Sequence, residues 1–145
     1  MIPPSETQLP LPFSLKVTYY VFFINSIIDV ALFTFIPRVL AKGMTLERQE
    51  FFAYRSTGVT LIPLALFFYN FHHHHPSTPI GSFVLRVFAF YHSSVFLLDG
   101  FTLWEEWSGH DSGFRLAVPA LACHGFWVIG ALMGRTAARK QIKVQ

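Results

Sequence analysis

The mostly apolar stretch from Ile80 to Trp104 constrains the fold more than any other part of the chain. It is long enough to cross the roughly 30 Å hydrocarbon core of a bilayer as an α-helix. It nevertheless contains Arg86, His92 and Asp99, residues that are costly in hydrocarbon and usually face a protein interior or a water-filled cavity. His92 and Asp99 are seven residues apart and therefore share one helix face. The stretch predicts a membrane helix with a functional polar face.

Three further apolar stretches have the length of a membrane helix, and we expect spans over residues 17–36, 51–70, 80–104 and 114–134. Only 13% of the residues are charged, against about a quarter in soluble domains. The sequence therefore predicts an all-α protein of one domain, residues 1–145, folded as a four-helix transmembrane bundle. Four spans place both termini on the same side, and a slight excess of Lys and Arg there favours cytosolic termini.

Each predicted span carries at least one ionisable residue in the same half of the bilayer. At 1.5 Å per residue, these side chains lie roughly 7 to 15 Å below the surface where the first and third connections run. A carboxylic acid, an ionised carboxylate held by arginine, and neutral histidines would together form a general acid–base set. We therefore predict five catalytic residues, namely Asp29, Arg55, His92, Asp99 and His124.

Within this set, Asp99 and Asp29 would act as acid and base, and Arg55 would hold one of them ionised. The histidines would relay protons or orient the substrate. The alternative interpretation is that Arg55 forms a structural ion pair with Asp29 or Asp99, which fixes the register of the helices.

Four more polar side chains are expected to bind substrate as hydrogen-bond donors, although each alone is more often a contact between helices. They are Asn25, Tyr54, Tyr91 and Ser93. Arg86 lies in the opposite half of the bilayer, where it either extends to the membrane surface or caps a ligand.

The connections carry weaker signals. Four consecutive histidines, His72 to His75, occupy a turn. Adjacent histidines cannot all face one ion, so we predict no metal site and expect the run to be dispensable.

Residues 105–113 are expected to form an acidic loop. The basic tail, residues 135–143, is expected to flank the membrane, and nucleic-acid binding is not expected. No dinucleotide, phosphate-loop or haem-attachment motif occurs, so an enzyme of this sequence is expected to need no cofactor.

Short motifs resemble the small four-span scaffold proteins of fungal sterol C4-demethylation in the endoplasmic reticulum. The likeness consists of an Asn-Ser pair, an Arg followed by a hydroxyl and a Gly, and an aromatic-His-x-Ser segment. That family has an acidic residue soon after the last serine, whereas here Phe96 and Leu97 intervene before Asp99. The resemblance implies a non-catalytic scaffold that tethers lipid- or sterol-biosynthetic enzymes. The matching residues are Asn25 and Ser26; Arg55, Ser56 and Gly58; Tyr91, His92 and Ser94.

The layout is also similar to the small integral-membrane cyclases, isomerases and epoxide hydrolases of fungal polyketide and terpenoid pathways. These enzymes work without cofactors through intramembrane carboxylates. We therefore expect an acid–base enzyme of secondary metabolism that acts on a lipophilic intermediate, with the scaffold as the alternative. A homo-oligomeric channel is disfavoured because the polar set does not run through the membrane. The expected partners are a lipophilic substrate, membrane lipid, and either further copies of the chain or pathway enzymes.

Overall fold

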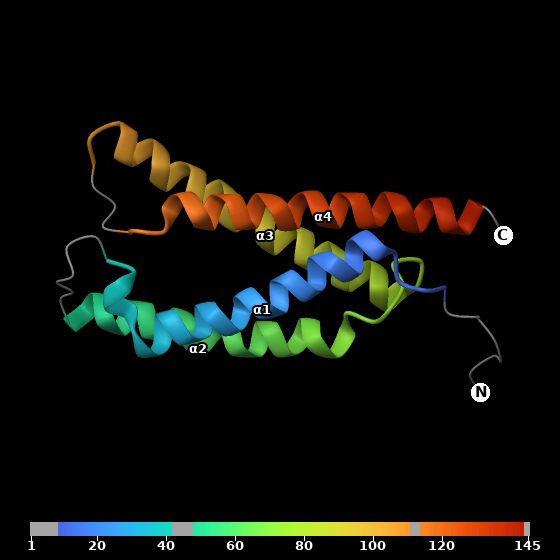
Figure 1. Cartoon of the computed structure of the whole chain (residues 1–145), viewed down its shortest axis with the longest axis horizontal. Helices are drawn as coiled ribbons and strands as arrows, with labels where there is room; N and C mark the ends of the chain where they lie inside the picture. The colour runs from blue at the N-terminus through green and yellow to red at the C-terminus, as the bar shows by residue number, and fades with distance from the viewer. Residues whose placement is uncertain (1–8, 42–47, 111–113, 144–145) are drawn as a thin grey trace.

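The computed structural model describes residues 9–41, 48–110 and 114–143. Four long helices alternate in direction: α1 (Phe13–Phe35), α2 (Arg48–Phe71), α3 (Pro79–Trp107) and α4 (Ala117–Lys143) (Figure 1). A short 3₁₀ helix, η1 (Pro37–Val39), follows α1. All four long helices have the length and hydropathy needed to cross a membrane. The predicted all-α, four-helix transmembrane bundle is confirmed, and the chain is a multi-pass integral membrane protein.

The helices form two hairpins, α1 with α2 and α3 with α4, which are joined mainly by packing of α1 on α4 (Figure 1). Two glycines of α4 make this contact close. A Cβ atom on Gly130 would overlap with the side chain of Thr18, and one on Gly134 would lie 2.8 Å from Leu15 Cδ1. The hairpins thus meet at a face of α4 that carries small residues, as expected for helices that associate by close backbone approach.

Aromatic rings fill the half of the bundle nearest the chain termini. The ring of Phe22 in α1 lies 5.4 Å from Phe68 in α2, 5.3 Å from Phe88 in α3 and 5.8 Å from Trp127 in α4, measured between ring centroids. The interplanar angles of 80° to 84° are the edge-to-face geometry that aromatic rings prefer. Many large apolar side chains on the outer faces are exposed, which suits a surface that contacts lipid.

Hydrogen bonds close both ends of the bundle. At the end with the first and third connections, Arg115 N–H donates to Leu40 O over 2.7 Å, and Ala41 forms an isolated β-bridge with Phe114. At the opposite end, Gln141 Nε2 donates to Pro10 O over 3.3 Å. The start of α1 and the end of α4 therefore lie together, as the even number of spans predicted (Figure 1).

The bounds of α3 and α4 differ from the prediction. Helix α3 continues to Trp107, so Glu105 and Glu106 are helical and do not belong to a loop. It stops where Gly109 adopts a φ of 91°, a left-handed conformation that commonly ends helices. Helix α4 begins only at Ala117, with Pro119 in its first turn, and continues beyond Gly134 to Lys143. The basic tail is thus the last part of a helix, and its lysines complement the negative end of the helix dipole.

The turn between α2 and α3 is a further correction. His75 is buried, its Nδ1 lies 2.7 Å from Ser77 Oγ, and its Nε2 lies 2.9 Å from Gln141 Oε1. A Cβ on Gly81, in the first turn of α3, would overlap with the carbonyl oxygen of His75. His75 therefore anchors α4 to the turn, whereas His73 is exposed. The burial and contacts of His75 argue against the expectation that all four histidines are dispensable.

We predict that Gly130→Ala lowers the free energy of unfolding by about 1–3 kcal/mol, because the added methyl group overpacks the contact with Thr18. Gly100→Ala is the matched control. Its Cβ would meet only Leu121 Cδ1 at 3.9 Å, so the better helix propensity of alanine should leave stability equal or higher. Thermal unfolding in detergent micelles measures both, and equal stability of the two variants would contradict the close packing.

We predict that His75→Ala costs about 1–3 kcal/mol of stability, since it removes a buried side chain and leaves the half-buried amide of Gln141 without its partner. His73→Ala should change stability by less than about 0.5 kcal/mol, because the side chain is exposed. The same unfolding assay separates the two positions. A His75→Ala variant as stable as wild type would show that this turn is not an anchor.

Candidate functional site

A cavity of about 290 Å³ lies between the two hairpins, in the half of the bundle nearer to the first and third connections. Side chains from all four helices line it. They include six of the nine residues predicted to form the site, namely Asn25, Asp29, Tyr91, His92, Asp99 and His124. Of the five residues selected by their depth in the predicted spans, the fold brings all but Arg55 to this cavity.

The two histidines form a direct pair across the α3–α4 interface. His92 Nδ1 and His124 Nδ1 lie 2.9 Å apart, so one ring donates this hydrogen bond and the other accepts it. A neutral imidazole that donates from Nδ1 has a bare Nε2, and one that accepts at Nδ1 carries its proton on Nε2. The neutral pair therefore always offers one basic and one acidic Nε2 atom.

Buried polar atoms in this cavity are left without a partner in the protein. Asp99 Oδ2, His92 Nε2 and Trp127 Nε1 are all buried, and none has a hydrogen-bond partner among the described residues. Buried polar groups are nearly always paired, so three such atoms around one cavity are suited to a polar ligand. They comprise a carboxyl oxygen, an imidazole nitrogen and an indole donor.

The second carboxylate has a different environment. Asn25 Nδ2 donates a short hydrogen bond to Asp29 Oδ2, one helical turn along α1. Asp29, Asp99 and Tyr91 line the same cavity. One carboxyl group is thus held by an amide while the other has a free oxygen, which is the asymmetry that an acid and a base require.

Aromatic side chains close the cavity toward the chain termini. The imidazole of His92 lies 5.3 Å from the ring of Phe22 and 4.6 Å from that of Trp127, and His124 lies 5.0 Å from Trp127. These contacts fix the orientation of both imidazoles. They also separate the polar cavity from the aromatic core beneath it.

Three predicted residues do not reach the cavity. Arg55 is exposed, and its guanidinium lies 5.7 Å from the ring centroid of Phe51. It forms no ion pair with Asp29 or Asp99, all three of which lie in the described part of the chain, so the expected pairing is wrong. The long side chain, about two turns from the start of α2, extends toward the membrane surface instead. Tyr54 packs on Phe33 at 5.9 Å, and Ser93 also lies outside the lining.

The lining residues that were not predicted as part of the site include Trp127, Cys123 and Thr57. Trp127 follows His124 by three residues, so the two share a helix face, and this spacing could have identified it. Cys123 is a free thiol. Within the described ranges, no group of three His, Cys, Asp or Glu side chains is arranged to hold a metal ion.

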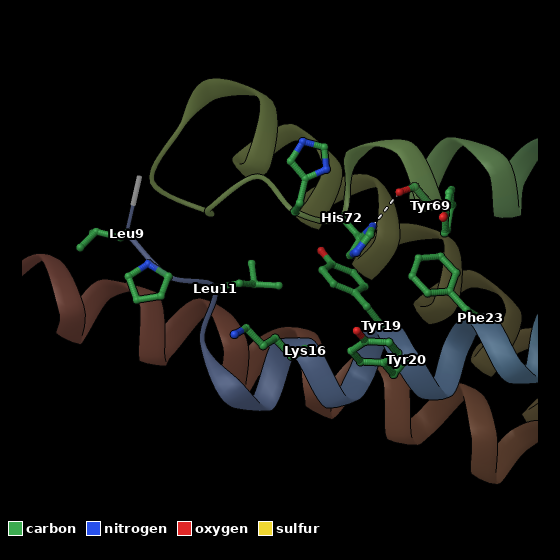
Figure 2. A pocket seen from close by; sticks show the side chains of 10 residues that line it. Leu9, Leu11, Lys16, Tyr19, Tyr20, Phe23, Tyr69 and His72 are labelled. Carbon is green, nitrogen blue, oxygen red and sulfur yellow. Dashed lines mark hydrogen bonds between the residues drawn. The ribbon is translucent and has the colours of Figure 1, made fainter. Parts of the chain in front are cut away.

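A second, larger cavity of about 620 Å³ lies at the end of the bundle that holds the chain termini (Figure 2). Tyr19, Tyr69 and His72 face it from α1 and the end of α2, with Lys16 at its edge (Figure 2). His72 Nδ1 lies 2.6 Å from Tyr69 O. Desolvation and the neighbouring imidazoles lower the pKa of His73, so Lys16 supplies the positive charge here. This cavity contains no carboxylate among its described lining residues and therefore lacks the acid–base pair of the first.

Comparisons with family models, curated proteins and solved structures gave no match to this chain.

We predict that the histidine pair is energetically coupled. His124→Phe should lower the free energy of unfolding by about 1–3 kcal/mol, because it leaves buried His92 Nδ1 without a partner. Replacing both histidines by Phe should cost less than the sum of the two single substitutions. The measurement is a double-mutant cycle by unfolding in detergent, and strict additivity would contradict the pairing.

Proposed function

We propose that this chain is a cofactor-independent acid–base enzyme of the membrane that acts on a lipophilic polyketide or terpenoid. The most concrete version is an epoxide hydrolase or cyclase of secondary metabolism, located in the endoplasmic reticulum. The observation that supports it most is the unpartnered, buried Oδ2 of Asp99, in a cavity that is also lined by the histidine pair and by the amide-held Asp29.

In this proposal, Asp99 is the acid. Its proton passes to the epoxide oxygen as the C–O bond breaks, and the substrate gains a hydroxyl group. Asp29 is the base, which removes a proton from water, or from a hydroxyl group of the substrate, as that oxygen forms the new C–O bond. Water gives a diol and an internal hydroxyl group gives a ring ether. The proton then returns from Asp29 to Asp99, and the histidine pair supplies groups that can accept and donate it.

The cavity suits a substrate that is mostly apolar. Its volume of about 290 Å³ is at the lower end of ligand cavities, which are typically about 300–1,000 Å³. A polyketide or terpenoid would therefore place its reacting end among the polar side chains. The remaining hydrocarbon would extend between the hairpins toward lipid, where it costs no desolvation of polar groups.

We predict that Asp99→Asn and Asp29→Asn each lower turnover about 10²- to 10⁴-fold, since each removes a proton-transfer group while keeping the size of the side chain. Glu105→Gln is the matched control, because it makes the same change on α3 outside the cavity lining. The assay incubates purified protein in nanodiscs with a panel of terpenoid and polyketide epoxides in ¹⁸O-labelled water. Mass spectrometry then detects diols and ring ethers.

The same experiment separates the enzyme from the non-catalytic scaffold. A scaffold would convert none of the epoxides, and its Asp variants would act only through stability or the binding of pathway enzymes. Full turnover in both Asp variants, or no turnover by the wild type across the panel, would contradict the proposed function.

A further inference from the structure

A groove separate from the cavity in Figure 2 lies at the same end of the bundle, between the first half of α3 and the second half of α4. It has a volume of about 290 Å³. Three arginines line it: Arg86 from α3, and Arg135 and Arg139 from α4. Arg135 and Arg139 are four residues apart and therefore share one face of α4. The groove thus collects three guanidinium groups from two helices.

These arginines have no carboxylate to neutralise them among the described residues. Arg86 Nε donates to Ser82 O over 3.3 Å, within its own helix, and Arg135 and Arg139 form no ion pair with any described residue. All five acidic residues in the described part of the chain lie elsewhere, on the second half of α1, the start of α2 and the second half of α3. Lys140 and Lys143 add positive charge to the same end of α4. The groove is therefore complementary to an anion.

Its floor is apolar and its position is interfacial. Leu85, Ala131 and Ala138 are buried beneath it, and the short alanine side chains leave the space open. Arg139 is four residues before the end of α4, and Arg86 is seven after the start of α3, which places them about 6 and 10 Å along their helices. In helices of about 40 Å that are centred on a hydrocarbon core of about 30 Å, this level is the boundary between the headgroups and the hydrocarbon that would contact the alanines.

We infer that this groove binds one anionic phospholipid, with its phosphate held by Arg86, Arg135 and Arg139 and an acyl chain along the alanine-lined floor. Guanidinium groups bind phosphate oxygens through paired, charge-assisted hydrogen bonds, which a single lysine ammonium does not reproduce. The site is independent of the polar cavity and of the reaction proposed for it, since the two share no lining residue.

The test is native mass spectrometry of the full chain in detergent, titrated separately with dioleoyl phosphatidylglycerol and dioleoyl phosphatidylcholine. Wild type should retain one phosphatidylglycerol at a lipid concentration about tenfold below that needed for phosphatidylcholine. Arg135→Gln with Arg139→Gln should abolish this preference. Lys140→Gln with Lys143→Gln is the matched control, with the same loss of charge on the same helix outside the groove, and should keep the preference within twofold.

Two further measurements in the same experiment distinguish a lipid site from a free-anion site and from a loss of folding. Arg135→Lys with Arg139→Lys keeps the charge, so partial retention of the preference is expected together with an unchanged melting temperature. Inorganic phosphate at millimolar concentration should not displace the lipid. Displacement by phosphate would indicate a free-anion site and overturn the inference. Equal binding of both lipids by wild type, or equal losses in the arginine and lysine variants, would overturn it as well.

Discussion

The ring of Phe22 is the contact on which the arrangement of the helices depends. From α1 it meets rings of α2, α3 and α4, including the imidazole of His92. In lipid, apolar side chains gain little from leaving their surroundings, so helices associate through close packing and polar contacts. One large ring that contacts three other helices supplies such packing. It also sets the boundary between the aromatic core and the polar cavity, so the shape of the cavity follows from it.

Much of this fold is readable from sequence because the bilayer allows few solutions. Four apolar stretches must be helices, since no other open structure satisfies its backbone hydrogen bonds in hydrocarbon. Counting residues along each helix also gives depth, and this count places His92 and His124 at one level, where they pair. Depth does not give the rotation of a helix about its axis. Arg55 has the predicted depth but lies on the exposed side of α2, so its expected ion pair is absent.

Other features depended on tertiary contacts that no local pattern contains. His75 is one of four consecutive histidines, and only the approach of Gln141 from the far end of the chain distinguishes it. Trp127 resembles an ordinary interfacial or core aromatic until the fold places its indole beside the imidazoles. A buried polar atom without a hydrogen-bond partner lowers stability. Where a protein retains such atoms, they generally belong to a functional site. Three unpartnered buried polar atoms around one cavity therefore indicate a functional site more strongly than the presence of any single residue type does.

The length of α3 has a consequence for where the protein can work. Its apolar part, residues 80–104, measures about 37 Å, which exceeds the roughly 30 Å of a hydrocarbon core. A helix with such positive hydrophobic mismatch tilts, and α3 crosses α4 obliquely (Figure 1). A thicker, sterol-rich membrane would favour a more upright α3, and a thinner one a more inclined α3. Because His92 and Asp99 lie on this helix, the geometry of the cavity is coupled to the thickness of the membrane around it.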